Sequence, residues 1–257
     1  MYVPSAAHRL PHRIASGSWN MAVDRCLLDW ACQERSRLVF RTYAWERPTL
    51  SLGRSNPFPE GWDEDAIARA GIEVSRRPTG GNAVLHVEEA TFALAASLPG
   101  PWRLTPRGFA NGAAEALAEA LRSCGLEGAT LTEERVSAAD RGSLCFARSA
   151  PGEVLARGYK VAGIASRFDR GGALCHASVP LTARSRDIAR FRSGENRDQA
   201  ALERNARSVG ELLGADQDAI AIGDALASRI ASRFGVDLID ASFEALGIDA
   251  CEPVSSR

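Results

Sequence analysis

Lysine is almost absent from this sequence of 257 residues. Of its 31 basic residues, 30 are arginine and one, Lys160, is lysine. A composition this biased indicates that arginine serves wherever a surface cation of any kind is sufficient. Lysine carries a compact, rotatable ammonium group, whereas the arginine guanidinium is a rigid planar fork. Lys160 is therefore predicted to occupy a site where a small cation must fit beside a carboxylate, a phosphate or a nucleophile. The alternative is a chance relic of a biased composition.

Other absences exclude several classes of protein. No apolar run approaches the roughly 20 residues that span a membrane, and a net charge of -1 leaves no basic excess for nucleic acid or an anionic membrane. Residues 1–18 lack the apolar core of a secretory signal. None of the six cysteines forms a CxxC pair or a zinc pattern, so no metal site is predicted. We therefore expect a cytoplasmic protein with reduced thiols.

The patterns along the chain predict one large domain that mixes helices and strands. Apolar periodicity and capping residues predict helices at 16–34, 63–71, 107–124, 208–213 and 216–234, with a last helical turn at 243–246. Alternating or short apolar segments predict strands at 38–45, 49–52, 72–75, 89–98, 131–136, 143–147, 153–156, 159–166 and 172–180. The charged segment 182–207 is predicted to be loop. The order of elements indicates an α+β fold with a mixed, mostly antiparallel sheet flanked by helices.

A pair of adjacent glycines marks the first candidate site, in the segment 76–86, Arg-Arg-Pro-Thr-Gly-Gly-Asn-Ala-Val-Leu-His. Adjacent glycines let backbone N–H groups approach an anion closely, and the two arginines and Thr79 add polar groups. The alternative is a Gly-Gly hairpin turn beside a solvated arginine pair. The segment has neither the lysine of a Walker loop nor the spacing of a dinucleotide fingerprint.

Two further residues depend on their surroundings for a function. His176 stands in an otherwise small and apolar strand, where a histidine is more often a satisfied core residue. Cys145, between Leu144 and Phe146, is by itself a packing residue. It becomes a candidate nucleophile only if Lys160 lies nearby, because a neighbouring ammonium favours the thiolate. A hairpin between residues 147 and 159 would bring the two together.

Taken in order, five segments resemble the lipoate–protein ligase and octanoyltransferase family, whose fold is related to that of biotin–protein ligases. They are residues 20–28, 43–53, 76–86 and 160–165, and His176 with Ser178. The resemblance implies a single catalytic domain of the biotin/lipoate ligase fold over residues 1–257. Residues 208–257 are then expected to pack on it as a helical C-terminal segment.

The resemblance also implies roles for individual residues. Lys160 and Cys145 correspond to catalytic residues. Substrate binding is implied for Arg77, Thr79, Gly80, Gly81, His86, Gly163 and His176. The sequence departs from the family pattern at Asn56, Asn82 and Ala177.

Two reactions share this fold. A transferase takes octanoyl or lipoyl from an acyl-carrier protein or an acylated donor domain, holds it on a cysteine, and passes it to a lysine of a lipoyl-domain protein without a cofactor. Cys145-Phe146 before the Lys-x-x-Gly segment most resembles the single-domain cysteine octanoyltransferases. A ligase instead uses ATP and Mg²⁺ to form lipoyl-AMP, with or without an accessory subunit. A non-catalytic acyl-binding or assembly protein is a third possibility, against which Lys160 argues.

Overall fold

The computed structural model describes residues 6–34, 36–100, 105–133, 144–169, 171–193, 197–248 and 251. The helices are α1 (Gly17–Gln33), α2 (Glu64–Arg69), α3 (Pro106–Ser123), α4 (Arg197–Asn205), α5 (Val209–Leu213) and α6 (Ala219–Phe234). The strands are β1 (Ala6–Arg9), β2 (Arg13–Ala15), β3 (Arg37–Trp45), β4 (Thr49–Leu52), β5 (Glu73–Arg76), β6 (Val84–His86), β7 (Glu89–Ser97), β8 (Thr130–Leu131), β9 (Val154–Ala156), β10 (Tyr159–Asp169), β11 (Gly172–Pro180) and β12 (Ile239–Asp240). Short 3-10 helices cover Cys145–Ala147, Ala183–Phe191 and Glu244–Leu246.

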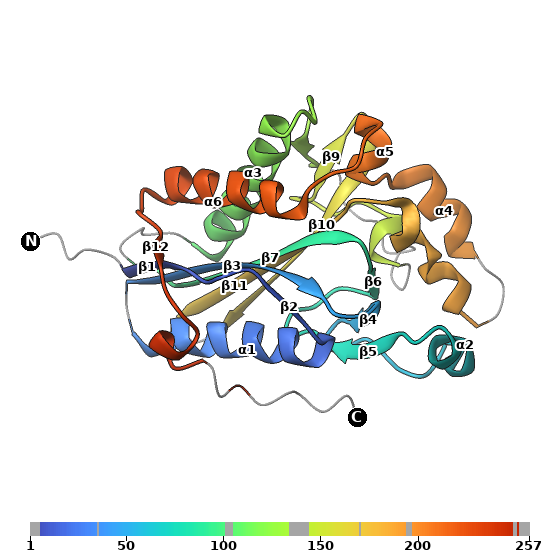
Figure 1. The fold of residues 1–257 in the computed structure, drawn as a ribbon, viewed down its shortest axis with the longest axis horizontal. Coiled ribbons are helices and arrows are strands. Elements are labelled where there is room, and N and C mark those ends of the chain that lie inside the picture. The colour runs from blue at the N-terminus through green and yellow to red at the C-terminus, as the bar shows by residue number, and fades with distance from the viewer. Residues whose placement is uncertain are drawn as a thin grey trace, which may run out of the picture.

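A large, mostly antiparallel sheet forms the centre of the molecule (Figure 1). Its described strands run in the order β12-β1-β3-β7-β11-β10-β9-β8, and β2 pairs with β3. The pairs from β3 through β8 are antiparallel, while β1 and β2 run parallel to β3. A second, smaller sheet has the order β5-β4-β6. The predicted mixed, mostly antiparallel architecture is confirmed.

Helices cover both faces of the large sheet (Figure 1). Helix α1 packs Leu27 and Leu28 against one face, where Val39 of β3 points. Helices α3 and α6 cover the opposite face, where the neighbouring Phe40 points. Successive side chains of a strand alternate between faces. Because both faces are covered, every residue of the central strands β7 and β11 is buried.

Two sequence-based expectations for secondary structure are wrong. The expected strand at 143–147 is a 3-10 turn at Cys145–Ala147, called the Cys145 turn below; residue 143 lies outside the described part. The turn lets the carbonyl groups of residues 145 and 148 converge on one ammonium, which a flat strand would not allow. The expected loop at 182–207 contains the helix Ala183–Phe191 and α4. Burial of Ile188 and Leu202 against Phe146 explains why it folds.

Other boundaries agree closely with the pattern. The helix predicted at 16–34 is α1, and Ser16 caps it by accepting from the backbone N–H of Trp19. Of the strand predicted at 131–136, residues 130–131 form β8, whereas 134–136 fall outside the described residues. Sequence patterns gave no sign of β1, β2, β6 or β12, each of which has four residues or fewer.

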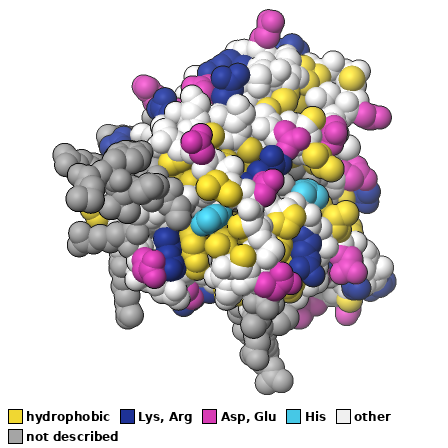
Figure 2. All heavy atoms as spheres, turned by 60° about the vertical axis from the view of Figure 1, so that its left-hand side comes forward, with side chains coloured by type: hydrophobic (Ala, Val, Ile, Leu, Met, Phe, Trp, Pro, Cys, Tyr) yellow, Lys and Arg dark blue, Asp and Glu magenta, His cyan; other side chains and the backbone are white. Residues whose placement is uncertain are grey.

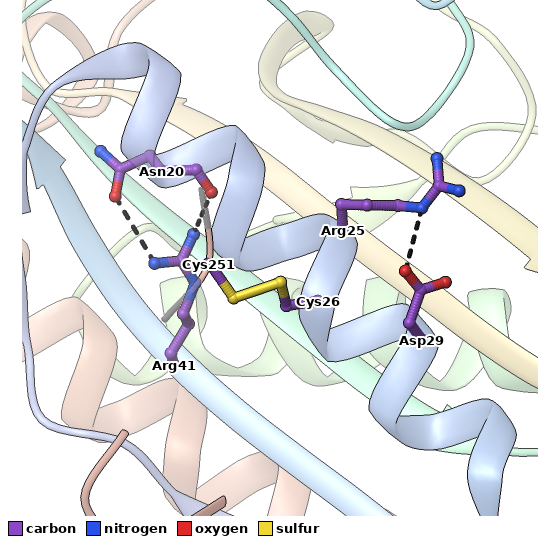
Figure 3. The surroundings of a disulfide bond; sticks show 6 residues. All are labelled: Asn20, Arg25, Cys26, Asp29, Arg41 and Cys251. Carbon is purple, nitrogen blue, oxygen red and sulfur yellow. Dashed lines mark hydrogen bonds and ion pairs between the residues drawn. A yellow bond between two sulfur atoms is a disulfide. The ribbon is translucent and has the colours of Figure 1, made fainter. Parts of the chain in front are cut away.

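The expectation that all cysteines are reduced is wrong for one pair. Cys26 on α1 and Cys251 form a disulfide (Figure 3) although 225 positions separate them in sequence. Phe243 and Ile248 pack in the same apolar cluster as residues of α1, and the Cα atoms of the two cysteines lie 6.5 Å apart. Cys32, Cys124, Cys145 and Cys175 are free.

The surface shown in Figure 2 mixes charges of both signs with apolar side chains. Within the described residues, no helix is both long and apolar enough to cross a membrane.

Candidate functional site

A cavity of about 340 Å³ lies where the small sheet and the Cys145 turn meet the large sheet. Strands β10 and β11 supply part of its wall, and the segment 77–82 closes another part. The volume is within the range of small-molecule sites. The apolar part of the lining includes Met21, Val84, Leu144, Ile164, Ala165 and Ala177.

The ammonium group of Lys160 lies at the Cys145 turn, and the residue is only 1% exposed. Its Nζ donates hydrogen bonds to the carbonyl oxygens of Cys145 at 2.5 Å and Arg148 at 3.1 Å, and to Glu153 Oε1 at 2.6 Å. These three acceptors match the three N–H donors of an ammonium. Lys160 therefore ties the Cys145 turn to β10, and its ion pair is with Glu153.

Local structure around Lys160 directs its side chain toward the turn. A β-bulge between Lys160 and Ala162 interrupts the pairing of β10 with β9, and bulges of this kind re-aim side chains. The Phe146 ring lies 4.9 Å from the ammonium, at cation–π distance. A β-carbon on Gly163 would lie 3.3 Å from this ring and 3.8 Å from Lys160 Cε. Glycine at position 163 thus leaves room for the ring and the lysine together.

Arg77 organises the segment that contains the paired glycines. It is 5% exposed. Its Nη1 donates to the carbonyl oxygen and to Oγ of Ser51, both at 2.7 Å, and its Nη2 donates to the carbonyl oxygens of Gly80 at 3.2 Å and Asn82 at 2.5 Å. Burial lowers the pKa of Arg77, and charge on the Cys145 side chain opposes this shift.

The two glycines of this segment have different surroundings. Gly81 has φ of 92°, in the region that favours glycine. A β-carbon on Gly81 would lie 3.3 Å from Arg77 Nη2 and 3.7 Å from Cys145 Sγ. A β-carbon on Gly80 would meet no atom within 4 Å. Only Gly81 is therefore required by its conformation.

A chain of buried polar groups continues from Arg77. Ser51 Oγ lies 2.5 Å from His86 Nε2, and His86 Nδ1 lies 2.7 Å from Glu89 Oε1. The His86 ring stacks on Trp45 with ring centroids 4.0 Å apart. Ser51 accepts from Arg77 and can donate to His86, which in turn donates to Glu89. Two side chains, those of Ser51 and His86, thus connect the guanidinium to the buried carboxylate of Glu89.

A second buried chain of polar groups holds His176. Its Nδ1 lies 2.9 Å from Asp24 Oδ2 and its Nε2 lies 2.7 Å from Thr79 Oγ1. Burial disfavours ionisation of Asp24, but Arg41 and His176 outweigh it and lower the pKa of this carboxyl. Burial lowers the pKa of His176 more than Asp24 raises it. A neutral His176 therefore donates from Nδ1 to Asp24 and accepts the Thr79 hydroxyl proton at Nε2.

The structure brings most of the residues singled out from the sequence to one cavity. The residues that line it are Cys145, Arg77, Gly80, Gly81, His86, Gly163 and His176. Lys160 and Thr79 lie behind the wall and touch lining residues. Sequence reasoning missed the carboxylates that hold these groups. Asp24 lay in the opening-helix segment, while Glu89 and Glu153 carried no signal beyond their charge. In the described part of the chain, no group of three or more His, Cys, Asp or Glu could hold a metal ion.

Comparison with known proteins identifies the family. Residues 16–231 match the family described as the lipoyl protein ligase A/B catalytic domain. The chain is 30% identical over 238 residues to octanoyltransferase LipM of Carboxydothermus hydrogenoformans, covering 90% of this chain and 87% of that protein. It is 32% identical over 237 residues to octanoyltransferase LipM of Kyrpidia tusciae, covering 87% and 85% respectively. The protein belongs to the lipoyl protein ligase A/B catalytic domain family, as the five segments indicated.

Solved structures support the same fold. A lipoate–protein ligase A bound with ATP superposes with a TM-score of 0.74 at 18% identity, covering 92% of this chain and 89% of that one. A bi-partite lipoate protein ligase from Thermoplasma acidophilum gives a TM-score of 0.74 at 17% identity, covering 97% and 99%. The predicted lipoate ligase catalytic-domain fold is confirmed.

The neutral state of buried His176 predicts a loss of stability in acid. The unfolded chain takes up a proton near the ordinary histidine pKa of 6.5, whereas the folded protein resists it to a lower pH. The free energy of unfolding should therefore decrease as pH falls below 6.5, with His176 contributing up to about 1.4 kcal/mol per pH unit. Urea unfolding at pH 7.5 and 5.0 should show a smaller decrease for His176→Gln than for the wild type. Equal decreases would mean that His176 is already charged in the fold.

The contrast between the two glycines predicts unequal effects of the same substitution. Gly81→Ala should lower the free energy of unfolding by about 1–3 kcal/mol, because alanine must adopt a positive φ there. Gly80→Ala, the matched control, should stay within about 0.5 kcal/mol of the wild type. Chemical denaturation measures both values. Equal stability of the two variants would contradict the conformation described for Gly81.

Proposed function

We propose that the protein transfers an octanoyl group from an acyl-carrier protein to a specific lysine of a lipoyl domain, in protein lipoylation, through a thioester on Cys145. One observation carries the proposal. Cys145 lines the cavity, and Lys160 fixes its turn by donating a hydrogen bond to the Cys145 carbonyl oxygen. The octanoyltransferase relatives support octanoyl as the acyl group. A solved relative described together with its E2 lipoyl domain supports a lipoyl domain as the acceptor.

The proposed reaction consists of two acyl transfers. In the first, the thiolate of Cys145 attacks the thioester carbonyl of the donor; a new C–S bond forms, the C–S bond to the carrier breaks, and the carrier leaves as a thiolate that takes a proton from solvent. In the second, the neutral amine of the acceptor lysine attacks the thioester on Cys145. The amide bond forms, the C–S bond to Cys145 breaks, the amine gives a proton to solvent, and the Cys145 thiolate is released. Neither transfer changes an oxidation state, so no redox cofactor is required.

The cavity supplies binding for an acyl chain of this size. Apolar side chains of α1, β10 and β11 line it, including Met21, Ile164 and Ala177. Each buried CH₂ group contributes about 0.8 kcal/mol to binding. We propose that Arg77, Gly80, Gly81 and His86 form the wall near the acyl carbonyl. Gly163 and His176, the latter backed by Thr79, complete the pocket.

We propose that Lys160 acts on the acyl carbonyl as negative charge develops on its oxygen. All three of its N–H donors have partners in the fold. To reach the substrate it would release one of the two main-chain carbonyls and keep Glu153. A small ammonium can make this exchange by rotation, whereas a planar guanidinium is fixed in its fork geometry.

The second candidate is an ATP-dependent lipoate–protein ligase that uses Mg²⁺ and forms lipoyl-AMP. A similar fold has been described for a lipoate–protein ligase bound with ATP, which favours this alternative. The octanoyltransferase relatives argue against a non-catalytic acyl-binding protein. For either enzyme we propose a cytoplasmic location. The four free cysteines are consistent with a reducing compartment. The Cys26–Cys251 disulfide is the one feature that is not.

Mass spectrometry after incubation with octanoyl-carrier protein tests the proposal. The wild type should gain one octanoyl group that hydroxylamine removes, and Cys145→Ala should gain none. Cys175→Ser is the matched control and should keep the adduct. Burial raises the pKa of Cys175 to about 11, so its thiol is inert near neutral pH.

A second assay separates the transferase from the ligase. Each protein receives a lipoyl-domain acceptor with either octanoyl-carrier protein or free octanoate, ATP and Mg²⁺. The transferase proposal predicts acylation only with the carrier protein. If Cys145→Ala still acylates the acceptor from free acid and ATP, the ligase proposal is correct and Cys145 is a packing residue.

A further inference from the structure

Arg77 is a buried cation without a carboxylate partner in the fold. It is 5% exposed, and its guanidinium binds three carbonyl oxygens and one hydroxyl. Among the described residues, no carboxylate lies within 4.0 Å of it, the limit for an ion pair. An arginine does not lose its charge by deprotonation. Buried charges in proteins are normally paired, so an anion is expected beside this one.

Lys160, the other buried cation near Cys145, is already neutralised. Its ion pair with Glu153 has a distance of 2.6 Å, and its remaining donors bind the carbonyl oxygens of Cys145 and Arg148. Lys160 thus holds the main chain of the Cys145 turn, and its positive charge is balanced by a carboxylate. A thiolate on Cys145 would be the second anion beside the Lys160 ammonium, whereas Arg77 has no anion beside it among the described residues.

The thiol of Cys145 is in position to be that anion. Cys145 Sγ and Arg77 Nη2 lie 3.7 Å and 3.3 Å from one point, the place of a β-carbon on Gly81. Both atoms therefore border the space that a side chain on Gly81 would fill. Against the lowering by burial, charge on the Cys145 side chain also raises the pKa of Arg77.

We propose that Arg77 is a catalytic residue that stabilises the thiolate of Cys145, and that Ser51, His86 and Glu89 are positioning residues that hold its guanidinium there. This inference rests on the proposed function, in which Cys145 is the nucleophile. The step is ionisation: the S–H bond breaks, the proton passes to solvent, and the sulfur keeps the electron pair. The carboxylate of Glu89 orders His86, which orders Ser51, and Ser51 receives two hydrogen bonds from Arg77.

Other titratable groups surround the same cavity and bear on the charge of the sulfur. Those that line it with Cys145 are Tyr43, Arg77, His86, Arg148, Glu153 and His176. Glu153 would oppose a thiolate, but Lys160 neutralises it. Asp24 is likewise paired with Arg41. Glu89 also acts on Arg77 through charge, but Ser51 and His86 lie between them. Among the described residues that line the cavity, Arg77 is therefore a buried cation with no carboxylate at ion-pair distance, and a thiolate would supply the missing anion.

The rate of alkylation by iodoacetamide, read at Cys145 by peptide mass spectrometry, tests the inference. Thiolates react and thiols do not, so at pH 7 Arg77→Gln should slow alkylation of Cys145 on the order of tenfold or more. At pH 10, where the thiol ionises without help, the two rates should agree within about twofold. Arg76→Gln is the matched control: its guanidinium binds the carbonyl oxygens of Gly53, Arg54 and Asn56, and it should behave as wild type.

Two further measurements distinguish a loss of thiolate stabilisation from a general loss of structure. Ser51→Ala should show a smaller, several-fold loss at pH 7 that also disappears at pH 10, which a general loss of structure would not produce. In the wild type, Cys145 should react at pH 7 at least severalfold faster than in the urea-unfolded chain. An equal rate would overturn the inference without any variant.

Lys160→Gln gives the opposing outcome. If it slows alkylation at pH 7 and recovers at pH 10 while Arg77→Gln does neither, Lys160 is the partner of the thiolate and the inference is wrong. Octanoyl transfer is a separate readout. A wild type that is octanoylated on Cys145 but whose alkylation ignores Arg77 would refute only this inference. An Arg77-dependent thiolate that accepts no octanoyl group would refute only the proposed function.

Discussion

The ammonium of Lys160 determines where the nucleophile candidate can be. Two carbonyl oxygens, from Cys145 and Arg148, and one carboxylate, from Glu153, meet at this single buried nitrogen. Leaving any of these groups unpaired inside the protein would cost on the order of 1–3 kcal/mol. The chain around Cys145 therefore turns instead of extending, and the turn closes one side of the cavity. A guanidinium is too large and too rigid to serve three acceptors in that space, which gives a physical reason for the one lysine in a chain that otherwise uses arginine.

Two cations then have distinct places around Cys145. Lys160 binds the main chain and is neutralised by Glu153, while Arg77 lies on the side of the sulfur without a carboxylate of its own. The arrangement of Arg77 depends on contacts from three strands or their loops, since Ser51 comes from β4, His86 from β6 and Glu89 from β7. The small sheet adds little to the main core, but its strands β4 and β6 supply the side chains that position the Arg77 guanidinium.

Much of this arrangement could be predicted from the sequence, and the remainder could not for identifiable reasons. Helix α1 and strands such as β7 follow from capping and apolar patterns, and the single lysine pointed to Lys160 directly. The Cys145 turn was expected to be a strand, because the apolar Leu144 and Phe146 flank Cys145 as in a buried strand. The sequence does not show that tertiary contacts with Lys160 bend the chain there. The helices within 182–207 were missed because the few apolar residues that bury them, such as Leu202, are spaced widely among charges. Glu153 and Glu89 look like ordinary carboxylates in the sequence, and only the fold shows which groups they bind. The Cys26–Cys251 disulfide could not be predicted because 225 positions separate the two cysteines.

A structure of the protein carrying an octanoyl thioester on Cys145 would test the central claim most directly, namely that the turn held by Lys160 presents Cys145 to the acyl cavity. The account predicts an acyl chain inside the cavity, along β10 and β11, with Lys160 Nζ still bound to Glu153 and the Cys145 turn unchanged. An acyl chain outside this cavity, or a turn released from Lys160 with the ammonium separated from Glu153, would contradict it.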